Sequence, residues 1–416
     1  MTSTTVERAS QISEPTVELS PMGKRAIWVS IVAVLFLGQV AYNIGEFPLA
    51  GDLVSYGMFT AYLLVSGYAA VSVPSLFIFA CFVALAAIRI PFAESATSWS
   101  SFLLLCTLYA PFIFRLVERA DLQPTQNYIL NAFVTGASII AGVAILQIVL
   151  VNALKLSALA NIYFVLPTAI RGAGTYTFLR EGGGGIVKAN GFFLRESADL
   201  SFVTALALLI EYRLRKRLHI LVLLGAALLF SMSGSGVIAL IAGLLLPRSL
   251  GRVPAFVAYT AGFVLLLVVL YSLDNPLLNI WFGRLSEFST PNTSAYARFI
   301  APMQMVQLGF EKGFFTTWLG NGAGSYFRDL SIGRFGYEVA DPTWAKLTYE
   351  YGLAGSVLVL TLLIVRLYSS SLRMELCNFL MFGWISLAFV LKPGYALIIW
   401  LLTLVPPARS RSSADP

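Results

Sequence analysis

The sequence has few charged residues, one histidine and little cysteine, and these shortages narrow the class of protein. Only 12% of its 416 residues are charged and 58% are hydrophobic, whereas a soluble domain carries about 25% charged residues. A surface this poor in charge cannot face water over most of its area. The lone histidine, His219, and three cysteines without CxxC or CxxH spacing argue against a metal site or a disulfide framework. We therefore expect neither a metal nor a cofactor.

Hydrophobic runs of roughly 20 residues recur along the chain, which is the length that a helix needs to cross a hydrocarbon core of about 30 Å. They predict an all-α fold, a polytopic transmembrane helix bundle of about twelve spans. The predicted spans are Ala26–Gly45, Leu53–Ala70, Pro74–Ile90, Trp99–Leu116, Tyr128–Val151, Ala198–Tyr212, Leu218–Phe230, Val237–Leu246, Pro254–Leu273, Leu353–Tyr368, Asn378–Leu391 and Tyr395–Val405.

Residues 218–246 allow two interpretations, one long helix or two short ones. A single helix would be about 43 Å long, which exceeds the bilayer unless it tilts strongly. With two helices, fifteen basic residues lie on one side of the membrane, whereas the short loops on the other side hold only Arg89 and Lys392. Cytoplasmic loops carry the excess of lysine and arginine. Both termini are therefore predicted to be cytoplasmic, and the net charge of +7 requires no nucleic-acid partner.

This topology divides the chain into five parts. We predict a disordered cytoplasmic tail over 1–25, nine spans over 26–273 with an extracytoplasmic loop at 152–197, a large extracytoplasmic loop over 274–352, three spans over 353–405 and a cytoplasmic tail over 406–416. Long loops in compact proteins are commonly functional. The large loop contains Trp281, Trp318 and Trp344, and this aromatic content predicts a cap packed over the membrane.

Three segments of small residues each allow a structural and a functional interpretation. The segment S231-M-S-G-S-G is either a helix hairpin or a nest of backbone N–H groups for an anion. The segment G320-N-G-A-G-S-Y follows no predicted strand, so a turn fits it better than a dinucleotide-binding loop. The segment E350-Y-G-L-A-G suits close helix packing through Gly352 and Gly355, which leaves the charge of Glu350 at the membrane boundary unexplained.

The charges of the large loop are nearly balanced. Its cations are Arg284, Arg298, Lys312, Arg328, Arg334 and Lys346, and its acids are Asp274, Glu287, Glu311, Asp329, Glu338, Asp341 and Glu350. A solvated position is the simpler interpretation for any one of them, and we expect it for Glu311 and Lys312. Arginine nevertheless binds phosphate oxygens bidentately, and aromatic faces stack on sugar rings. Arginines near carboxylates and aromatics at a membrane surface therefore suit an anionic lipid headgroup that carries a sugar.

Four stretches around this loop resemble the O-antigen polymerase and O-antigen ligase family of bacterial inner-membrane glycosyltransferases. They are N190-G-F-F-L-R-E-S, S231-M-S-G-S-G-V-I-A-L, S294-A-Y-A-R-F followed by L319-G-N-G-A-G-S-Y, and D341-P-T-W-A-K-L-T-Y-E-Y-G-L-A-G. In this order they are similar to the family patterns G-F-F-x-E-P-S, S-R-G, R…G-x-G and H-N…E-x-G-x-x-G. The resemblance covers roughly residues 190–365.

The resemblance implies a metal-independent, GT-C-like glycosyltransferase that moves a glycan from a polyprenyl pyrophosphate carrier to an acceptor hydroxyl at the periplasmic face of the inner membrane. Asp341 stands where ligases carry histidine, and Gly234 stands near the arginine of the family. Both departures favour a polymerase of an exopolysaccharide, capsule or O-antigen over an O-antigen ligase. Its protein partners would be a chain-length regulator or a flippase.

This chemistry needs a base and cations. We expect Asp341 to accept the proton of the acceptor hydroxyl, with Glu350 as the second choice, and Arg298 to stabilise the departing pyrophosphate. The other predicted substrate-binding residues are Arg284, Arg195, Glu196, Arg328, Arg334 and Trp344. The rival interpretation is a transporter or flippase for lipid-linked oligosaccharide. The scarcity of ionisable residues inside the predicted spans argues against that rival.

Overall fold

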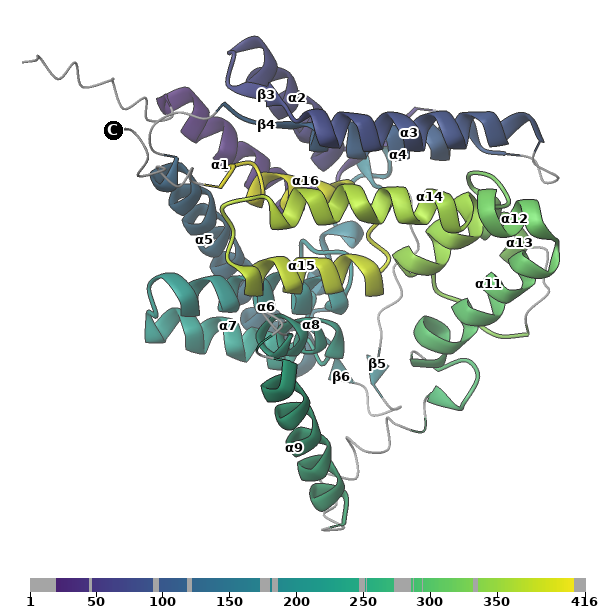
Figure 1. Ribbon diagram of the computed structural model, residues 1–416. Coiled ribbons are helices and arrows are strands. Elements are labelled where there is room, and N and C mark those ends of the chain that lie inside the picture. The colour runs from purple at the N-terminus through teal and green to yellow at the C-terminus, as the bar shows by residue number, and fades with distance from the viewer. Residues whose placement is uncertain are drawn as a thin grey trace, which may run out of the picture.

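A computed structural model shows a bundle of helices with three antiparallel two-stranded ladders among the described residues (Figure 1). It describes residues 20–44, 47–92, 97–117, 122–172, 180–181, 186–246, 251, 253–272, 286, 288–293, 295–331 and 336–407. The helices are α1 (Pro21–Phe36), α2 (Gly51–Val65), α3 (Val73–Arg89), α4 (Trp99–Tyr109), α5 (Gln123–Ile148), α6 (Ser197–Leu214), α7 (Leu218–Phe230), α8 (Gly234–Leu245), α9 (Val253–Ser272), α11 (Ala301–Glu311), α12 (Phe314–Leu319), α13 (Ser325–Ser331), α14 (Thr343–Tyr368), α15 (Met374–Ser386) and α16 (Pro393–Leu402). The ladders pair β1 (Ala41–Ile44) with β2 (Phe47–Ala50), β3 (Ala69–Val71) with β4 (Phe114–Leu116), and β5 (Arg180–Glu181) with β6 (Ile186–Val187).

Four helical segments are long and apolar enough to cross a membrane. They are Val73–Phe92, Gln123–Ala153, Val253–Ser272 and Thr343–Tyr368. The shorter apolar helices are Trp99–Ile113, Leu218–Phe230, Gly234–Leu245 and Pro393–Leu402. The prediction of an all-α fold is confirmed, whereas the number of about twelve spans is not.

Residues 218–246 form two helices, α7 and α8, rather than one. The chain turns at Met232, which has a φ of 47°, and α8 then crosses α6 at very short range. The Ser201 hydroxyl donates to the Ser233 carbonyl at 2.8 Å and accepts from the Gly236 N–H at 3.0 Å. A Cβ on Gly236 would come within 2.1 Å of the Ser201 carbonyl oxygen. This segment is therefore a hairpin that requires small residues, and Ser201 already occupies an N–H group that an anion would need.

The bundle has two distinct ends. We call the first the basic end, because Arg115 and the buried Arg366 lie there. Its backbone hydrogen bonds join Ser72 N to Ile113 O at 2.8 Å, Leu116 N to Leu404 O at 3.0 Å and Ser371 N to Val405 O at 3.0 Å. The second is the loop end, where Ser98 N donates to Ala323 O at 2.8 Å and Thr343 N donates to Leu387 O at 3.0 Å. Helices α3, α14 and α16 run between these two ends.

The apolar side chains form one large core and one small one. The large core joins α1, α5, α6, α15 and α16, and α14 packs between α3 and α15. The small core lies at the loop end and holds Met305, Val306, Tyr326, Ala345 and Tyr349. Helix α9 stands apart, because none of its apolar window is buried, and it leaves the bundle at a steep angle to α3 and α14 (Figure 1).

Candidate functional site

Two glycine motifs that lie about thirty residues apart in sequence form a single close crossing at the loop end. Gly322 N donates to the Glu350 carbonyl at 2.9 Å, and Asn321 N donates to the Tyr349 carbonyl at 2.9 Å. Gly320 and Gly352 both have positive φ, 81° and 68°. A Cβ on Gly320 would lie 2.3 Å from the Glu350 carbonyl oxygen, and one on Gly352 would lie 2.4 Å from the Trp318 carbonyl. Both positions therefore require glycine, and the turn and close-packing interpretations describe them well.

Glu350 is buried at this crossing. Its Oε1 has no hydrogen-bond partner among the described residues, and the glycine-rich segment covers the helix around it. An acceptor hydroxyl cannot reach the Glu350 carboxyl without movement of residues 320–326. This geometry favours a positioning role for Glu350 over a role as base.

Asp341 lies just before α14 and forms an ion pair with Lys346, with Nζ 3.6 Å from Oδ2. The Lys346 ammonium also sits 3.9 Å from the centroid of the Phe327 ring, a cation–π contact. Lys346 and Glu350 are four residues apart in α14, so they share one face of the helix. Sequence reasoning counted Lys346 only as one cation among six. The signal that could have singled it out was its i, i+4 spacing from Glu350.

The segments that carry Arg298 and Asp341 meet in space. Arg298 lies in a π-helical turn, Tyr296–Ile300, that leads into α11. The Ala340 N–H donates to the Ala297 carbonyl at 2.8 Å, so the residues adjacent to Arg298 and Asp341 are in direct backbone contact. Arg298 forms no ion pair with any residue that the structure describes.

Tyr326 also holds the segment that contains Ala340 and Asp341. Its hydroxyl donates to the Ala340 carbonyl at 2.6 Å. Burial raises the pKa of Tyr326 well above its usual range, and the negative charges of Asp341 and Glu350 raise it further. The phenol therefore stays protonated and remains a donor to the backbone beside Asp341.

The remaining residues predicted in the large loop have varied positions. Arg328 donates through Nη2 to the Ala323 carbonyl at 3.2 Å, and Trp344 packs against the small core. Lys312 was expected to be solvated, but it is partly buried and bonds the Asp329 carboxylate at 2.9 Å and the Tyr349 hydroxyl at 3.1 Å. Arg284 and Arg334 lie outside the described residues.

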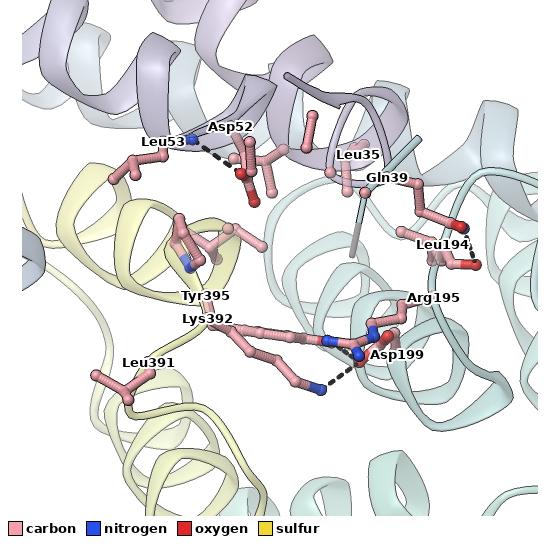
Figure 2. Close-up of a pocket in the computed structure, with 18 of the residues that line it drawn as sticks. Leu35, Gln39, Asp52, Leu53, Leu194, Arg195, Asp199, Leu391, Lys392 and Tyr395 are labelled. Carbon is pink, nitrogen blue, oxygen red and sulfur yellow. Dashed lines mark hydrogen bonds and ion pairs between the residues drawn. The ribbon is translucent and has the colours of Figure 1, made fainter. Parts of the chain in front are cut away.

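Arg195 and Glu196 lie away from these loop residues, at the start of α6. Glu196 is the N-cap of α6 and forms a reciprocal capping box with Asp199. Its carboxylate thus accepts a backbone N–H of its own helix, and substrate binding by Glu196 stays a prediction. Arg195 is exposed beside Asp199 at the mouth of a cavity (Figure 2).

This cavity has a volume of about 410 Å³ and lies at the loop end, between α1, α2, α4, α6 and α16. Its wall is mainly apolar, and its charged groups are Asp52, Arg195, Asp199 and Lys392 (Figure 2). Lys392 Nζ lies 3.6 Å from Asp199 Oδ1, and the Tyr395 hydroxyl donates to the same oxygen. A mainly apolar cavity with a few convergent polar groups is the usual form of a small-molecule site.

Three buried amides hold the segment that leads to Arg195. Gln147 accepts from the N–H groups of Asn190 and Gly191, both at 3.0 Å. Gln39 and Asn161 each donate to the Leu194 carbonyl, at 2.8 and 3.1 Å. The segment N190-G-F-F-L-R is therefore rigidly placed. Sequence reasoning missed Gln39 and Gln147, because an isolated amide in an apolar helix carries no motif.

The cavity and the large-loop residues are joined through the connection between α15 and α16. The Thr343 hydroxyl, two residues after Asp341, donates to the Leu387 carbonyl at 2.8 Å and accepts from Phe389 N at 3.2 Å. The ring of Phe389 stacks on Tyr395 in the cavity wall. Asp341 and Asp199 are thus linked through the packed connection between α15 and α16.

No protein-family model and no curated protein matches this chain. Its classification therefore rests on its own residues, which define an all-α protein with four helices able to cross a membrane and a polar site at one end of the bundle. Within the described ranges, no group of three or more His, Cys, Asp or Glu side chains is placed to hold a metal ion.

Proposed function

We propose that the protein is an inner-membrane polymerase of a surface polysaccharide, an exopolysaccharide, capsule or O-antigen. It would transfer a growing glycan from a polyprenyl pyrophosphate carrier to a hydroxyl of a lipid-linked repeat unit. The observation that carries this proposal is the hydrogen bond between Ala340 and Ala297. It brings the segments that carry a cation and a carboxylate, distant in sequence, into contact at the end of an apolar bundle.

In this proposal the bundle spans the membrane, the basic end and both termini face the cytoplasm, and the loop end faces the periplasm. The excess of basic residues at predicted cytoplasmic segments supports this orientation. A polyprenyl pyrophosphate has its tail in the bilayer and its headgroup at the membrane surface. The loop end would therefore lie at the depth at which the bond between the pyrophosphate and the anomeric carbon of the sugar is exposed.

The reaction is a substitution at the anomeric carbon of the donor sugar. The acceptor oxygen forms a bond to that carbon as the bond to the pyrophosphate oxygen breaks, and polyprenyl pyrophosphate leaves. Asp341 takes the proton of the acceptor hydroxyl. Arg298, with no ion pair to a described carboxylate, stabilises the charge that develops on the pyrophosphate. Lys346 compensates the charge of Asp341 before the proton arrives.

The test is turnover by the purified chain in liposomes that contain a lipid-linked repeat unit. A ladder of longer glycans on the carrier, with release of polyprenyl pyrophosphate, is the expected result. Glycan transfer to lipid A core instead would identify an O-antigen ligase. Movement of a fluorescent lipid-linked oligosaccharide between leaflets without any new glycosidic bond would identify the transporter or flippase alternative and overturn the proposal.

Orientation is tested separately in cells. A reporter inserted after Gly313, in an open turn between α11 and α12, should be active as alkaline phosphatase and dark as a cytoplasmic fluorescent protein. The reverse pattern would place the loop end in the cytoplasm, where this chemistry could not build a surface polymer.

A further inference from the structure

The cavity between α1, α2, α6 and α16 contains polar groups that the proposed chemistry does not use. They lie at the loop ends of α1 and α2, and neither Arg298 nor Asp341 lines the cavity. Their hydrogen-bonding capacity indicates what the cavity holds.

Gln39 lines the cavity and carries a buried acceptor without a partner among the described residues. Its side-chain amide is buried, at 5% exposed, and its Nε2 donates to the Phe193 and Leu194 carbonyls at 3.0 and 2.8 Å. These two bonds fix the orientation of the amide, because only the nitrogen can donate to a carbonyl. The Oε1 atom is then left without a hydrogen-bond partner among the described residues. Burial of an unpaired acceptor is costly, so a small movement that opens Oε1 to an O–H or N–H donor in the cavity would be favourable.

Asp52 presents a second acceptor. Its carboxyl is buried in the cavity wall and accepts from the Leu53 N–H at 2.8 Å and from the backbone N–H groups of Gly394 and of Asp52 itself. Two glycines flank it, since a Cβ on Gly394 or Gly38 would lie 3.0 or 3.6 Å from Asp52 Oδ2. It forms no ion pair with a described residue. A carboxylate has about four acceptor positions, so Asp52 retains capacity for donors from a ligand.

The charged groups of the cavity suit a neutral occupant better than a pyrophosphate. Two acids, Asp52 and Asp199, face two bases, Arg195 and Lys392, and burial raises the pKa of the Asp52 carboxyl to about 7. Asp199 already engages Lys392 and Tyr395, which leaves no excess of positive charge for an anion. An isoprenoid tail is equally unsuited, because it would leave Gln39 and Asp52 buried without donors.

We infer that this cavity binds a neutral, hydroxyl-rich sugar ring of the lipid-linked substrate, with Gln39 and Asp52 accepting its hydroxyl hydrogens. Phe193 and Tyr395 supply aromatic surface to the C–H faces of the ring. The volume of about 410 Å³ falls within the usual range of roughly 300–1,000 Å³ for small-molecule sites. This inference rests on the proposed function, because it names the part of the substrate that the site selects.

The experiment measures how much a sugar adds to lipid binding. The full chain in nanodiscs is titrated with polyprenyl pyrophosphate that bears one N-acetylhexosamine and, separately, with sugar-free polyprenyl pyrophosphate. In the wild type the sugar should lower Kd by about tenfold or more, because it adds hydrogen bonds to a charged acceptor. Asp52→Asn, which keeps an acceptor for Leu53 N, should remove about tenfold of that gain and leave the Kd of the sugar-free lipid unchanged.

A second variant, Gly38→Ala, tests the same cavity in case Asp52→Asn does not fold. Gly38→Ala adds a methyl group beside Asp52 at 3.6 Å, an ordinary contact that the fold tolerates, and it should also reduce the gain from the sugar. The matched control is Gly57→Ala in α2, where a Cβ meets nothing within 4 Å. Competition by the methyl glycoside of the same sugar should be seen in the wild type and lost in Gly38→Ala. Retention of that competition in Gly38→Ala would place the sugar outside this cavity and overturn the inference.

Equal affinity of the wild type for both lipids would overturn the inference. So would a Gly38→Ala effect on the sugar-free lipid, since the cavity would then hold lipid or pyrophosphate. The proposed function fails by a different readout. If the wild type makes no polymer but Gly38→Ala still abolishes the gain from the sugar, then the reaction is wrong and the sugar site stands.

Discussion

At the loop end, two lysine–aspartate pairs have the same distance between nitrogen and oxygen. The lysine is the more buried partner in one pair, and the aspartate is the more buried partner in the other. In both, the lysine nitrogen lies 3.6 Å from a carboxylate oxygen. In the large loop Lys346 is 3% exposed and Asp341 is 28% exposed, whereas in the cavity Asp199 is 7% exposed and Lys392 is 25% exposed. The loop pair thus has the more exposed acid, and the cavity pair has the more exposed base. We take this as the physical difference between a site that receives a proton and a site that binds.

The largest expected effect concerns chemistry in the large loop. Arg298→Ala and Asp341→Asn should each lower turnover roughly 100- to 1000-fold, the usual cost of losing one preorganised group at a developing charge. Arg298→Lys should recover little, because lysine cannot present a bidentate fork. The measurement is polymer yield normalised to protein in the membrane. Glu338→Gln, on the exposed segment before Asp341, should be silent.

Full activity in Asp341→Asn would show that Asp341 is not the base. The two lysine–aspartate pairs would then have no difference in chemical role. Full activity in Arg298→Ala as well would leave the reaction without a site in the large loop. Lys392→Met should instead affect Kd for the lipid-linked sugar more than turnover, because Lys392 only supports the cavity wall.

The second prediction concerns the stability of the close backbone crossing at Gly352, which belongs to the large loop and not to the cavity. Gly352→Ala should cost about 3 kcal/mol or more, since alanine must adopt a positive φ and its Cβ must displace the Trp318 backbone. Thermal unfolding in detergent and protease sensitivity of residues 295–331 report this loss. Gly336→Ala, where a Cβ meets nothing within 4 Å, is the control. If Gly352→Ala is as stable as Gly336→Ala, then the crossing at Glu350 is not formed.

The third prediction tests which partner is the more buried one in each lysine–aspartate pair. Asp341→Asn leaves the buried Lys346 ammonium unpaired and should lower the free energy of unfolding by about 2 kcal/mol, less than for a fully buried pair because Asp341 is partly exposed. Asp341→Asn with Lys346→Met should restore most of that stability. Lys392→Met should cost about 1 kcal/mol or less, since Asp199 keeps Tyr395 and the Glu196 N–H. Equal losses in the free energy of unfolding for Asp341→Asn and Lys392→Met would contradict the difference in burial between the two pairs.

The smallest expected effect concerns Tyr326 and pH. Tyr326→Phe loses the bond to Ala340 and should cost about 1 kcal/mol. Because the pKa of Tyr326 is raised in the folded chain, the unfolded chain loses this proton first, near pH 10. Folded-state stability should then fall as pH rises above about 10. The slope of melting temperature against pH should be shallower in Tyr326→Phe, and an unchanged slope would mean that Tyr326 is not buried.

By itself the sequence determined the elements that local chemistry dictates. Apolar runs with few charges predicted the helices, and the charge pattern predicted two helices over 218–246, as α7 and α8 show. The S-A-Y-A-R-F and D-P-T-W stretches pointed to Arg298 and Asp341, which do meet through their neighbours. Each of these predictions depends on residues close together in the chain.

Only the tertiary structure decided which polar groups are covered and which line the cavity. Glu350 and Glu196 were predicted to bind substrate or accept a proton, yet one is covered by the 320–326 segment and the other caps α6. Gln39, Asp52 and Lys392 carry no motif and line the cavity, because five helices from distant parts of the chain bring them together. Burial depends on such long-range contacts, whereas a linear pattern records only residue type and spacing. The roles of these carboxylates and amides therefore followed from packing.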